Sequence, residues 1–360
     1  MKSRPTESLA TVVVVPRQRF SIVRRTLPTL LACTPPSVPI VYVDGGSPAP
    51  IARFIVKAAR ERPPFRIVRS EQYLAPNEAR NLGLLAVGTR YVIFADNDVL
   101  VAPRWVEGLV QCAEETGAWV VAPTVCIGEP AFRTIHNVGG IAHFEDRPEG
   151  RRFIDHHRFS NTLLGSVPAA LRREQVEFVE NHCVMARTDI FARIGELDEE
   201  LLSATEHFDF CLRVREGGGT IWFDPASAVN YLPARRLARA DLSFYMLRWS
   251  DRWNQASLRR FCEKWRLAED DPFRLGHYYW ITDKRMLVLG RAWRLSRRAL
   301  GFRRTIWAGR TFERLVTRFL LPEETRRRAA ARRARALAAA GLGKEDGTDT
   351  VKVLEPLAGV

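Results

Sequence analysis

Apolar and polar positions along the first 230 residues alternate between two periods. Short β-branched runs that end at turn-forming residues predict buried parallel strands. Four runs are of this kind: residues 11–15, 40–43, 65–68 and 91–95. Segments with apolar residues three and four positions apart predict helices between and after them. These segments are residues 20–32, 51–60 and 76–88. The alternation of strand and helix predicts an α/β fold in which helices flank a mostly parallel central sheet.

The pattern changes farther along the chain. Residues 126–180 are rich in Gly, Pro, His and Arg, and predict loops and short strands over one face of the sheet. Helical and strand patterns then return, so we assign residues 1–230 to one domain. Residues 231–340 mix Trp, Arg and Leu at helical spacing and predict a C-terminal helical extension. For residues 341–360 we expect a weakly ordered, flexible tail.

The charge of the chain is uneven. Its 360 residues carry 55 Lys and Arg against 41 Asp and Glu, a formal net charge of +14. The excess lies in residues 231–340, whereas residues 1–230 are close to neutral. The six cysteines are scattered singly, which excludes a disulfide scaffold and a zinc site built from cysteine pairs. No signal-peptide pattern and no run of roughly 18 to 20 apolar residues occurs, so we expect a cytoplasmic chain.

The acidic sequence Asp96-Asn97-Asp98 directly follows the fourth predicted strand. Ligands of doubly wound sheets bind outside the carboxyl ends of the strands, so these carboxylates lie where a site is expected. Carboxylates are hard oxygen ligands that suit Mg²⁺ or Mn²⁺ shared with substrate phosphates. The same spacing is also common in solvated turns, so the metal hypothesis needs support from the rest of the sequence.

Five segments resemble, in the same order, the motifs of family 2 glycosyltransferases. They are residues 43–47 (the strand end VD-(D/N)-G-S), 76–83 (the ARN-x-G helix), 92–99 (the D-x-D strand), 195–199 (the G-x-[FL]-D-E turn) and 206–213 (the E-D-x-D-[FL]-x-x-R helix). The resemblance implies the GT-A fold, a Rossmann-like sandwich. It also implies transfer of a sugar from a nucleoside-diphosphate-sugar donor to the hydroxyl of a glycan, lipid-linked or small-molecule acceptor.

The resemblance implies roles for individual residues. Asp96 and Asp98 would hold Mn²⁺ or Mg²⁺, which bridges two phosphates and neutralises charge on the leaving nucleoside diphosphate. Six residues would contact the donor substrate: Pro16, Arg17, Asp44, Arg80, Asn81 and Asn97. Among these, Asp44 would accept hydrogen bonds from the base or ribose. Arg80 would face the base or the diphosphate.

The catalytic helix departs from the family pattern at its start. The usual acidic pair is Glu206-His207 here, so a histidine stands where family members carry the base aspartate. An inverting transferase needs a base that takes the proton of the acceptor hydroxyl, and both a carboxylate and an imidazole suit that task. Glu206, His207 and Asp209 therefore remain three alternatives for the base. Asp209 also has a structural interpretation, an ion pair with Arg213 one turn later.

Two further departures concern the donor pocket and the metal. Gly45 replaces the second acidic or amide residue of the strand-end motif, which leaves Asp44 as the only carboxylate there. Asn230 stands where many members of the family carry a third metal ligand, a histidine. An amide oxygen is a weaker ligand, and His182 is an alternative third ligand. A histidine beside a strand also has a purely structural interpretation.

Six tryptophans of residues 231–340 are interleaved with arginines, and this pattern has three interpretations. They are Trp249, Trp253, Trp265, Trp280, Trp293 and Trp307. The rings could pack against the catalytic domain and leave the arginines as a solvated face. Amphipathic helices of this composition also contact anionic membranes, which would suit a lipid-linked acceptor. Nucleic acid is the weaker alternative as a polyanionic partner.

Two other functions account for parts of the sequence. A non-catalytic descendant that binds a nucleotide or polyanion would explain Glu206-His207 and Asn230, because such a protein needs neither the base nor the third ligand. A nucleotidyltransferase shares the strand–helix layout and a metal carboxylate. However, it carries a glycine-rich loop after its first strand, and residues 16–19 contain no glycine.

Overall fold

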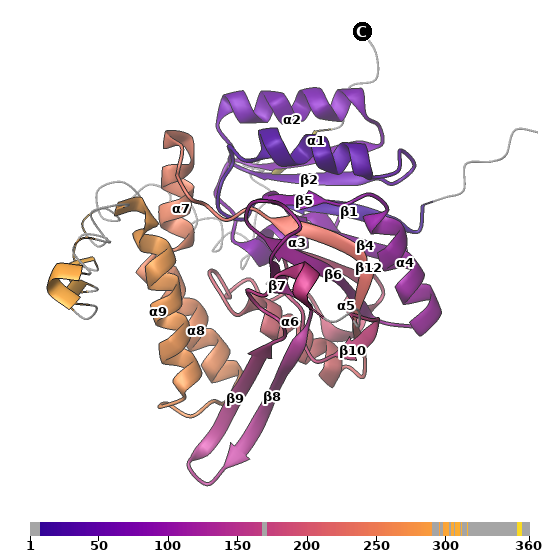
Figure 1. Ribbon diagram of the computed structural model, residues 1–360. Coiled ribbons are helices and arrows are strands. Elements are labelled where there is room, and N and C mark those ends of the chain that lie inside the picture. The colour runs from indigo at the N-terminus through magenta and orange to yellow at the C-terminus, as the bar shows by residue number, and fades with distance from the viewer. Residues whose placement is uncertain are drawn as a thin grey trace, which may run out of the picture.

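A central sheet flanked by helices forms the body of the protein in the computed structural model (Figure 1). The structure describes residues 8–167 and 171–289, together with residues 295, 298–301, 304–305, 307–309, 311, 315 and 351–354. The strands of this sheet are β1 (Ala10–Val15), β2 (Ile40–Gly45), β3 (Phe65–Ser70), β4 (Tyr91–Asp96), β5 (Val99–Val101), β6 (Val120–Ile127), β7 (Ile135–Asn137), β10 (Glu174–Val176), β11 (Cys183–Arg187), β12 (Ile221–Tyr231) and β13 (Val351–Leu354).

The order of the strands is that of a doubly wound sheet with additions at its edges. Along the described part of the chain it reads β10-β12-β6-β11-β4-β1-β2-β3-β13, with β5 paired to β12 and β7 to β6. Strand β1 pairs in parallel with β2 and β4, β2 pairs in parallel with β3, and β6 pairs in parallel with β12. Antiparallel β11 lies between β4 and β6. The predicted mostly parallel α/β sheet is therefore confirmed.

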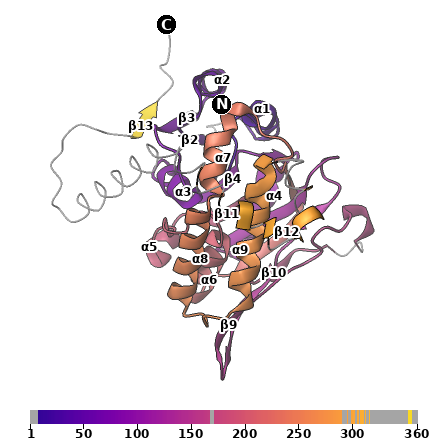
Figure 2. The ribbon, with the colours of Figure 1, turned by 90° about the vertical axis from the view of Figure 1, so that its left-hand side faces the viewer.

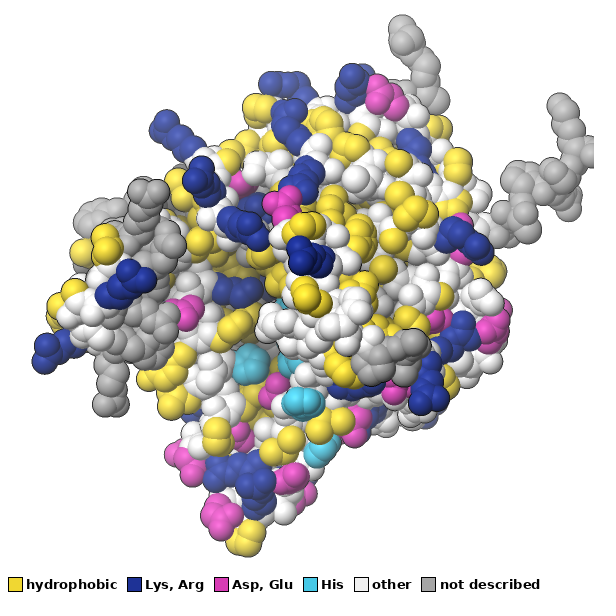
Figure 3. Space-filling model, in the orientation of Figure 1, with side chains coloured by type: hydrophobic (Ala, Val, Ile, Leu, Met, Phe, Trp, Pro, Cys, Tyr) yellow, Lys and Arg dark blue, Asp and Glu magenta, His cyan; other side chains and the backbone are white. Residues whose placement is uncertain are grey.

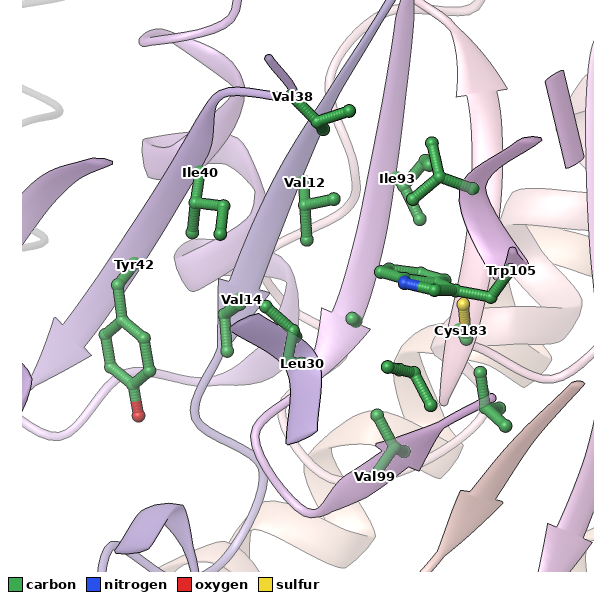
Figure 4. Packing of buried hydrophobic residues seen from close by; sticks show 14 of the residues in the cluster. Val12, Val14, Leu30, Val38, Ile40, Tyr42, Ile93, Val99, Trp105 and Cys183 are labelled. Carbon is green, nitrogen blue, oxygen red and sulfur yellow. The ribbon is translucent and has the colours of Figure 1, made fainter. Parts of the chain in front are cut away.

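Alternate residues of β1 face two different cores, as the period of a strand requires. Val12 and Val14 pack with α1 (Val23–Cys33), α2 (Ala49–Glu61) and α4 (Trp105–Thr116) on one face. Figure 4 shows these two valines with Tyr42 and Trp105 in that core. Val13 and Val15 face the other core, with α3 (Pro76–Leu84), α5 (Ile190–Ile194) and α6 (Glu206–Glu216). Burial on both faces explains the uninterrupted apolar run of the first strand.

Helix α3 packs closely against β1 and β2 at Gly83. A β-carbon placed on Gly83 would lie 2.3 Å from Val13 Cγ1 and 3.0 Å from Val43 Cγ2. Such a contact would force the helix away from the strands. The glycine of the predicted ARN-x-G helix therefore allows α3 to bring Arg80 and Asn81 beneath the strand ends.

The segment 126–180 forms a projecting hairpin in addition to short strands. Strands β8 (Gly140–Arg147) and β9 (Gly150–His157) pair antiparallel with each other, and a 3₁₀ turn covers Leu164–Ser166. The hairpin leans on α8 (Asp251–Trp265) and α9 (Pro272–Arg285) (Figure 1). The ring of Phe153 on β9 lies 5.3 Å from that of Phe261 and 4.8 Å from that of Phe273. This contact fixes the hairpin beside the two helices.

Residues 231–289 pack directly onto the sheet and its helices. Helices α7 (Leu242–Arg248), α8 and α9 stand together on one side of the sheet (Figure 2), with 3₁₀ turns at Arg239–Asp241 and Met286–Leu289. Trp249, Trp253 and Trp265 are buried, as the packing interpretation of the tryptophans predicts, whereas Trp280 and Trp307 are exposed. Phe244 joins the core of α1, and Trp265 joins the core of α6. The boundary expected at residue 230 therefore does not separate two cores.

Two expectations for the C-terminal part meet different outcomes. Residues 351–354 form β13, which pairs antiparallel with β3, so this part of the expected flexible tail is a strand. Trp293 and residues 316–340 of the expected helical extension lie outside the described residues. None of the helices in the described part of the chain combines the length and the hydropathy that a membrane span requires.

Candidate active site

A cavity of about 490 Å³ lies where the sheet, the hairpin, α6 and α9 meet. Its lining includes Arg17, Ile127, His136, His157, Ser160, Asn161, Glu180, Asn181, Ser203, Ala204, Glu206, His207, Arg248, Trp249, Gly276, His277, Trp280 and Lys284. Figure 3 shows histidine side chains gathered in a hollow of the surface. The cavity thus brings together residues from the expected catalytic domain and from the expected extension.

Asp96 and Asp98 occupy a buried position at the end of β4, and their side chains have different partners. Arg17 Nη1 lies 2.7 Å from Asp96 Oδ2, and Arg80 Nη2 lies 3.3 Å from Asp96 Oδ1. Asp98 Oδ2 accepts a hydrogen bond from Gln18 Nε2 at 3.1 Å. Asp98 Oδ1 is buried without a hydrogen-bond partner among the described residues. Burial raises the pKa of Asp98 to about 6, although Arg17 opposes the effect.

His182 completes a set of potential metal ligands with this acidic pair. Each of Asp96, Asp98 and His182 offers one ligand atom, and these atoms lie within 4.8 Å of one another. His182 Nδ1 is 3.2 Å from Asp96 Oδ2, and within the described part of the chain neither ring nitrogen has a hydrogen-bond partner. Open carboxylate and imidazole donors fit a divalent cation such as Mn²⁺. The alternative third ligand His182 is thus in reach of the acidic pair.

Asn230 has a structural function instead. Its Oδ1 accepts a hydrogen bond from the backbone N–H of Phe132 at 2.8 Å, and its Nδ2 donates to the carbonyl oxygen of Gly128 at 3.0 Å. Both ends of the amide are therefore used to hold the loop after β6. The amide at the position that carries a histidine in many family members is thus engaged by backbone groups of this loop.

Glu206 and His207 begin α6 and line the cavity. Thr205, just before them, has a left-handed backbone with φ of 68°, a strained conformation that is frequent at functional sites. Glu206 Oε1 lies 3.3 Å from Arg248 Nη2. Glu206 Oε2 and His207 Nε2 are buried with no hydrogen-bond partner in the described residues. Burial lowers the pKa of His207, which favours the neutral imidazole.

Asp209 does not line the cavity, and its carboxylate has protein partners. Its carboxylate lies 2.7 Å from Lys264 Nζ and accepts a hydrogen bond from Trp265 Nε1 at 3.0 Å. Arg213 Nη1 lies 3.8 Å away on the same helix. Burial raises the pKa of Asp209 and Lys264 opposes the rise. These contacts fit the structural interpretation of Asp209, with Lys264 as a closer partner than Arg213.

Of the six residues expected to contact the donor, only Arg17 lines the cavity. Asn81 accepts a hydrogen bond from the backbone N–H of Leu197 and donates to its carbonyl oxygen, at 3.1 and 2.9 Å. Asn97 accepts from the backbone N–H of Arg17 at 3.2 Å and donates to the carbonyl oxygen of Arg19 at 2.7 Å. These two asparagines fix the turn at residues 195–199 and the loop after β1. Their side chains position neighbouring segments of the site.

The other expected donor residues are engaged with protein groups. Asp44 accepts hydrogen bonds from the backbone N–H and the hydroxyl of Ser47 at 2.9 and 3.0 Å, and forms an ion pair with Arg69. Asp44 borders a second cavity, of about 520 Å³, between α2 and β3. Pro16 packs near Gly45, and Arg80 is held by Asp96 and by Asn77 Oδ1 at 3.2 Å. A nucleotide that reaches Asp44 must therefore compete with Arg69.

Several cavity residues have no role in the sequence-based hypothesis. They are His136, His157, Glu180, Arg248, Trp249, His277, Trp280 and Lys284. Burial, with Arg17 nearby, lowers the pKa of Lys284 to about 8, and its Nζ lies 4.4 Å from the centre of the Trp280 ring. The concentration of histidines in residues 126–180 was a signal for part of this set. Lys284 has no local signal, because its position depends on how α9 packs.

Comparison with family models identifies one family. The model of the family described as glycosyl transferase family 2 matches residues 11–195. Proteins named pre-mycofactocin glycosyltransferase from two Mycobacterium tuberculosis strains, CDC 1551 / Oshkosh and ATCC 25618 / H37Rv, are each 27% identical over 230 residues, which is 64% of this chain and 44% of theirs. The chain therefore spans less than half the length of these curated relatives.

Solved structures with a similar arrangement are more distant. GalNAc-T7 with UDP, GalNAc and Mn²⁺ has a TM-score of 0.48 and 17% identity, over 64% of this chain and 44% of its own. Residues 1–349 of S. aureus TarS with UDP-GlcNAc have a TM-score of 0.45 and 13% identity, over 84% and 89% of the two chains.

Proposed function

The chain belongs to glycosyl transferase family 2, and we propose that it transfers a sugar from a nucleoside-diphosphate-sugar donor to an acceptor hydroxyl in the 490 Å³ cavity. One observation carries this proposal. Arg17 of the cavity wall pairs with Asp96, beside which Asp98 and His182 carry open metal-ligand atoms, and Glu206 of the same wall carries an open carboxylate oxygen, among the residues that the structure describes. A metal-assisted transfer needs these two kinds of group beside each other.

We assign the divalent cation, Mn²⁺ or Mg²⁺, to Asp98 and His182, with Asp96 as the third group. A cation bound there would act as a Lewis acid that neutralises charge on the leaving nucleoside diphosphate. Both oxygens of Asp96 already face guanidinium groups, from Arg17 and Arg80. Asp96 therefore serves first to hold these two arginines in place, and Asp98 offers the stronger free donor.

Two cations of the cavity wall suit the diphosphate of the donor. Arg17 follows β1, at the end where ligands of such sheets bind, and Lys284 reaches the same cavity from α9. Guanidinium and ammonium groups stabilise phosphate oxygens by charge-assisted hydrogen bonds. In this proposal Lys284 stabilises the departing nucleoside diphosphate. It lies outside the segments that resemble the family motifs.

Glu206 is our choice for the general base of an inverting transfer. Arg248 orients Oε1 at 3.3 Å, while Oε2 remains open to accept the proton of the acceptor hydroxyl. Neutral His207 borders the same cavity, so it remains the alternative to Glu206 as the base. The contacts of Asp209 with Lys264 and Trp265 argue against it as the base.

Incubation with a panel of nucleotide sugars and Mn²⁺ tests the proposed reaction. The expected result is release of a nucleoside diphosphate from one donor and no release after EDTA treatment. A protein that binds nucleotides without turning any of them over would instead be the non-catalytic descendant. Nucleotide-sugar synthesis from a nucleoside triphosphate and a sugar phosphate would indicate a nucleotidyltransferase.

We further propose that any peripheral membrane contact uses exposed apolar side chains between residues 300 and 315. Leu300, Trp307 and Leu315 are exposed there, and the exposed Arg304 lies among them in the sequence. Sedimentation with vesicles of anionic lipid tests this contact. Binding that Trp307→Ala and Leu300→Ala do not weaken would contradict it.

A further inference from the structure

We propose, on the basis of the proposed function, that a groove beside the transfer cavity binds the acceptor and that this acceptor is a neutral saccharide. The groove has a volume of about 590 Å³ and lies between the β8–β9 hairpin and α9 (Figure 1). Gly276 and His277 line both the groove and the cavity, so the two spaces adjoin each other. Asp271 accepts hydrogen bonds from the backbone N–H of Phe153 at 3.0 Å and of Phe273 at 2.8 Å, and so ties the two walls together.

Strand β9 forms one wall of this continuous space. Alternate residues of a strand face the same side, so Phe153, Asp155 and His157 form one row. Phe153 and Asp155 line the groove, and His157 lines the cavity. In the described part of the chain His157 Nε2 pairs with Asp155 Oδ2 at 3.9 Å, which is beyond hydrogen-bond distance. The Asp155 carboxylate is therefore open to accept hydrogen bonds from ligand hydroxyl groups.

Helix α9 forms the opposite wall with a row of rings. Phe273, His277 and Trp280 share a helix face because they are four and three residues apart. The His277 ring lies 4.0 Å from that of Phe273 and 6.2 Å from that of Trp280. Burial lowers the pKa of His277 to about 3, so its ring is neutral. The row offers apolar surface to the faces of sugar rings from the groove into the cavity.

Gly276 leaves the passage between the groove and the cavity open. Glycine inside a helix is less favourable than every residue except proline. A β-carbon placed on Gly276 would meet no other described atom within 4 Å, so close packing does not explain the glycine. Without a side chain at this position, a saccharide in the groove can extend into the cavity. Its terminal hydroxyl would then lie in the same space as Glu206.

The charges of the groove favour a neutral ligand over an anionic one. Arg152 donates to both carboxylate oxygens of Asp270, at 2.7 and 3.1 Å. Arg147 donates to Glu145 from Nε at 3.0 Å. Both arginines of the groove are thus paired with carboxylates, whereas Asp155 is open. A phosphate or carboxylate ligand would be repelled by Asp155, but hydroxyl groups would find an acceptor there.

Stimulation of nucleoside diphosphate release by added acceptors tests the groove through acceptor length. The probes are malto-, cello- and chito-oligosaccharides of increasing length, with uronic acid oligosaccharides as anionic counterparts. In the wild type we expect the KM of a neutral series to fall about tenfold from its shortest to its longest member, because the longer chains reach Asp155. Asp155→Ala and Gly276→Leu should abolish this dependence on length. Asp146→Ala is the matched control on the exposed part of the same hairpin and should retain it.

Binding of the same oligosaccharides on a glycan array, measured without donor, separates the groove from the reaction. The wild type and Asp146→Ala should bind neutral oligosaccharides about tenfold more tightly than Asp155→Ala and Gly276→Leu. This pattern without consumption of any donor would refute the proposed function and support the groove. Asp155→Ala decides the matter if circular dichroism shows that Gly276→Leu does not fold. No binding of neutral oligosaccharides by the wild type, a preference for the anionic ones, or equal binding by folded Asp155→Ala would overturn the inference.

Discussion

The strand ends of the central sheet and the helices α7 to α9 contribute to the candidate site by different routes. Strand ends bring Asp96 and Asp98 to one edge of the sheet through parallel pairing, which is a property of the fold class. Helix α9 brings Trp280 and Lys284, and α7 ends with Arg248. These positions depend on packing against the hairpin and the sheet.

The sequence motifs locate the residues at the strand ends, but they do not locate the side chains that α7 to α9 bring to the cavity. The family match ends at residue 195, before α6 and before all three of these helices. We infer that the strand-end half supplies the chemistry common to the family, and that α7 to α9 adjust the cavity to the substrates of this chain. Variants of the strand-end residues and variants of α7 to α9 should therefore differ in the kinetic parameter that changes as well as in the size of the change.

The largest effect is expected at the strand ends. Asp98→Asn removes a carboxylate ligand while it keeps the size of the side chain, so transfer should fall about 10³-fold, as the loss of several kcal/mol of metal stabilisation implies. Measurement of transfer at saturating Mn²⁺ tests this. Asp146→Asn, on the exposed part of the hairpin, is the control and should leave the rate unchanged. A tenfold or smaller loss in Asp98→Asn would place the metal elsewhere.

The next effect is expected where the two regions meet, at Glu206 and its partner Arg248. Glu206→Gln removes the base and should lower kcat by about 10²- to 10⁴-fold, the usual contribution of general base catalysis. His207→Gln should lower it by less than tenfold, because the neutral imidazole only borders the site. Single-turnover kinetics of both variants compare them directly. The reverse order of the two losses would identify His207 as the base.

A smaller, pH-dependent effect is expected from α9. Lys284 stabilises a diphosphate only in its protonated form, and burial lowers its pKa to about 8. The catalytic efficiency kcat/KM for the donor should therefore decrease as the pH rises through about 8. Lys284→Met should lower kcat/KM at neutral pH by roughly tenfold and abolish this alkaline decrease. Lys57→Met on exposed α2 is the control. An unchanged pH profile in Lys284→Met would remove Lys284 from the donor site.

The smallest effect is expected at the rim of the cavity. Trp280 is 46% exposed and contributes an aromatic face beside Lys284. Trp280→Ala should raise the KM for the acceptor about 3- to 10-fold, in line with roughly 0.5 to 1.5 kcal/mol for one aromatic contact. The value of kcat should change little. A loss of kcat with an unchanged KM would mean that α9 acts on the chemical step.

The sequence predicted the parts of this molecule that depend on local pattern. Alternating apolar runs indicated the α/β sheet, and the acidic pair after β4 lies at its carboxyl edge. Helical periodicity placed Asp209 one turn after Glu206, but it gave no information on the Lys264 and Trp265 side chains that α8 places beside Asp209. The same limit applies to the tryptophans after residue 230, whose spacing is equally typical of a buried helix face and of a membrane-bound one.

The motifs also did not predict the roles of residues whose side chains contact distant segments of the chain. Asn81 and Asn97 belong to motif segments, yet their amides bond to the backbone of distant segments. His182 was one of two alternatives for a third ligand. The choice between it and Asn230 depends on which side chain meets the loop at Phe132 and which meets Asp96. Lys284 lies far from every motif in the sequence and reaches the cavity only through the packing of α9.

The most direct test of the account is consumption of a sugar nucleotide by the wild type and by Asp98→Asn, each with Mn²⁺ and with EDTA. We predict that the wild type with Mn²⁺ releases the nucleoside diphosphate from one donor of a panel. We predict no release by the wild type with EDTA or by Asp98→Asn under either condition. Equal release by Asp98→Asn and the wild type, or no release from any donor, would contradict the assignment of this cavity as a metal-assisted transfer site.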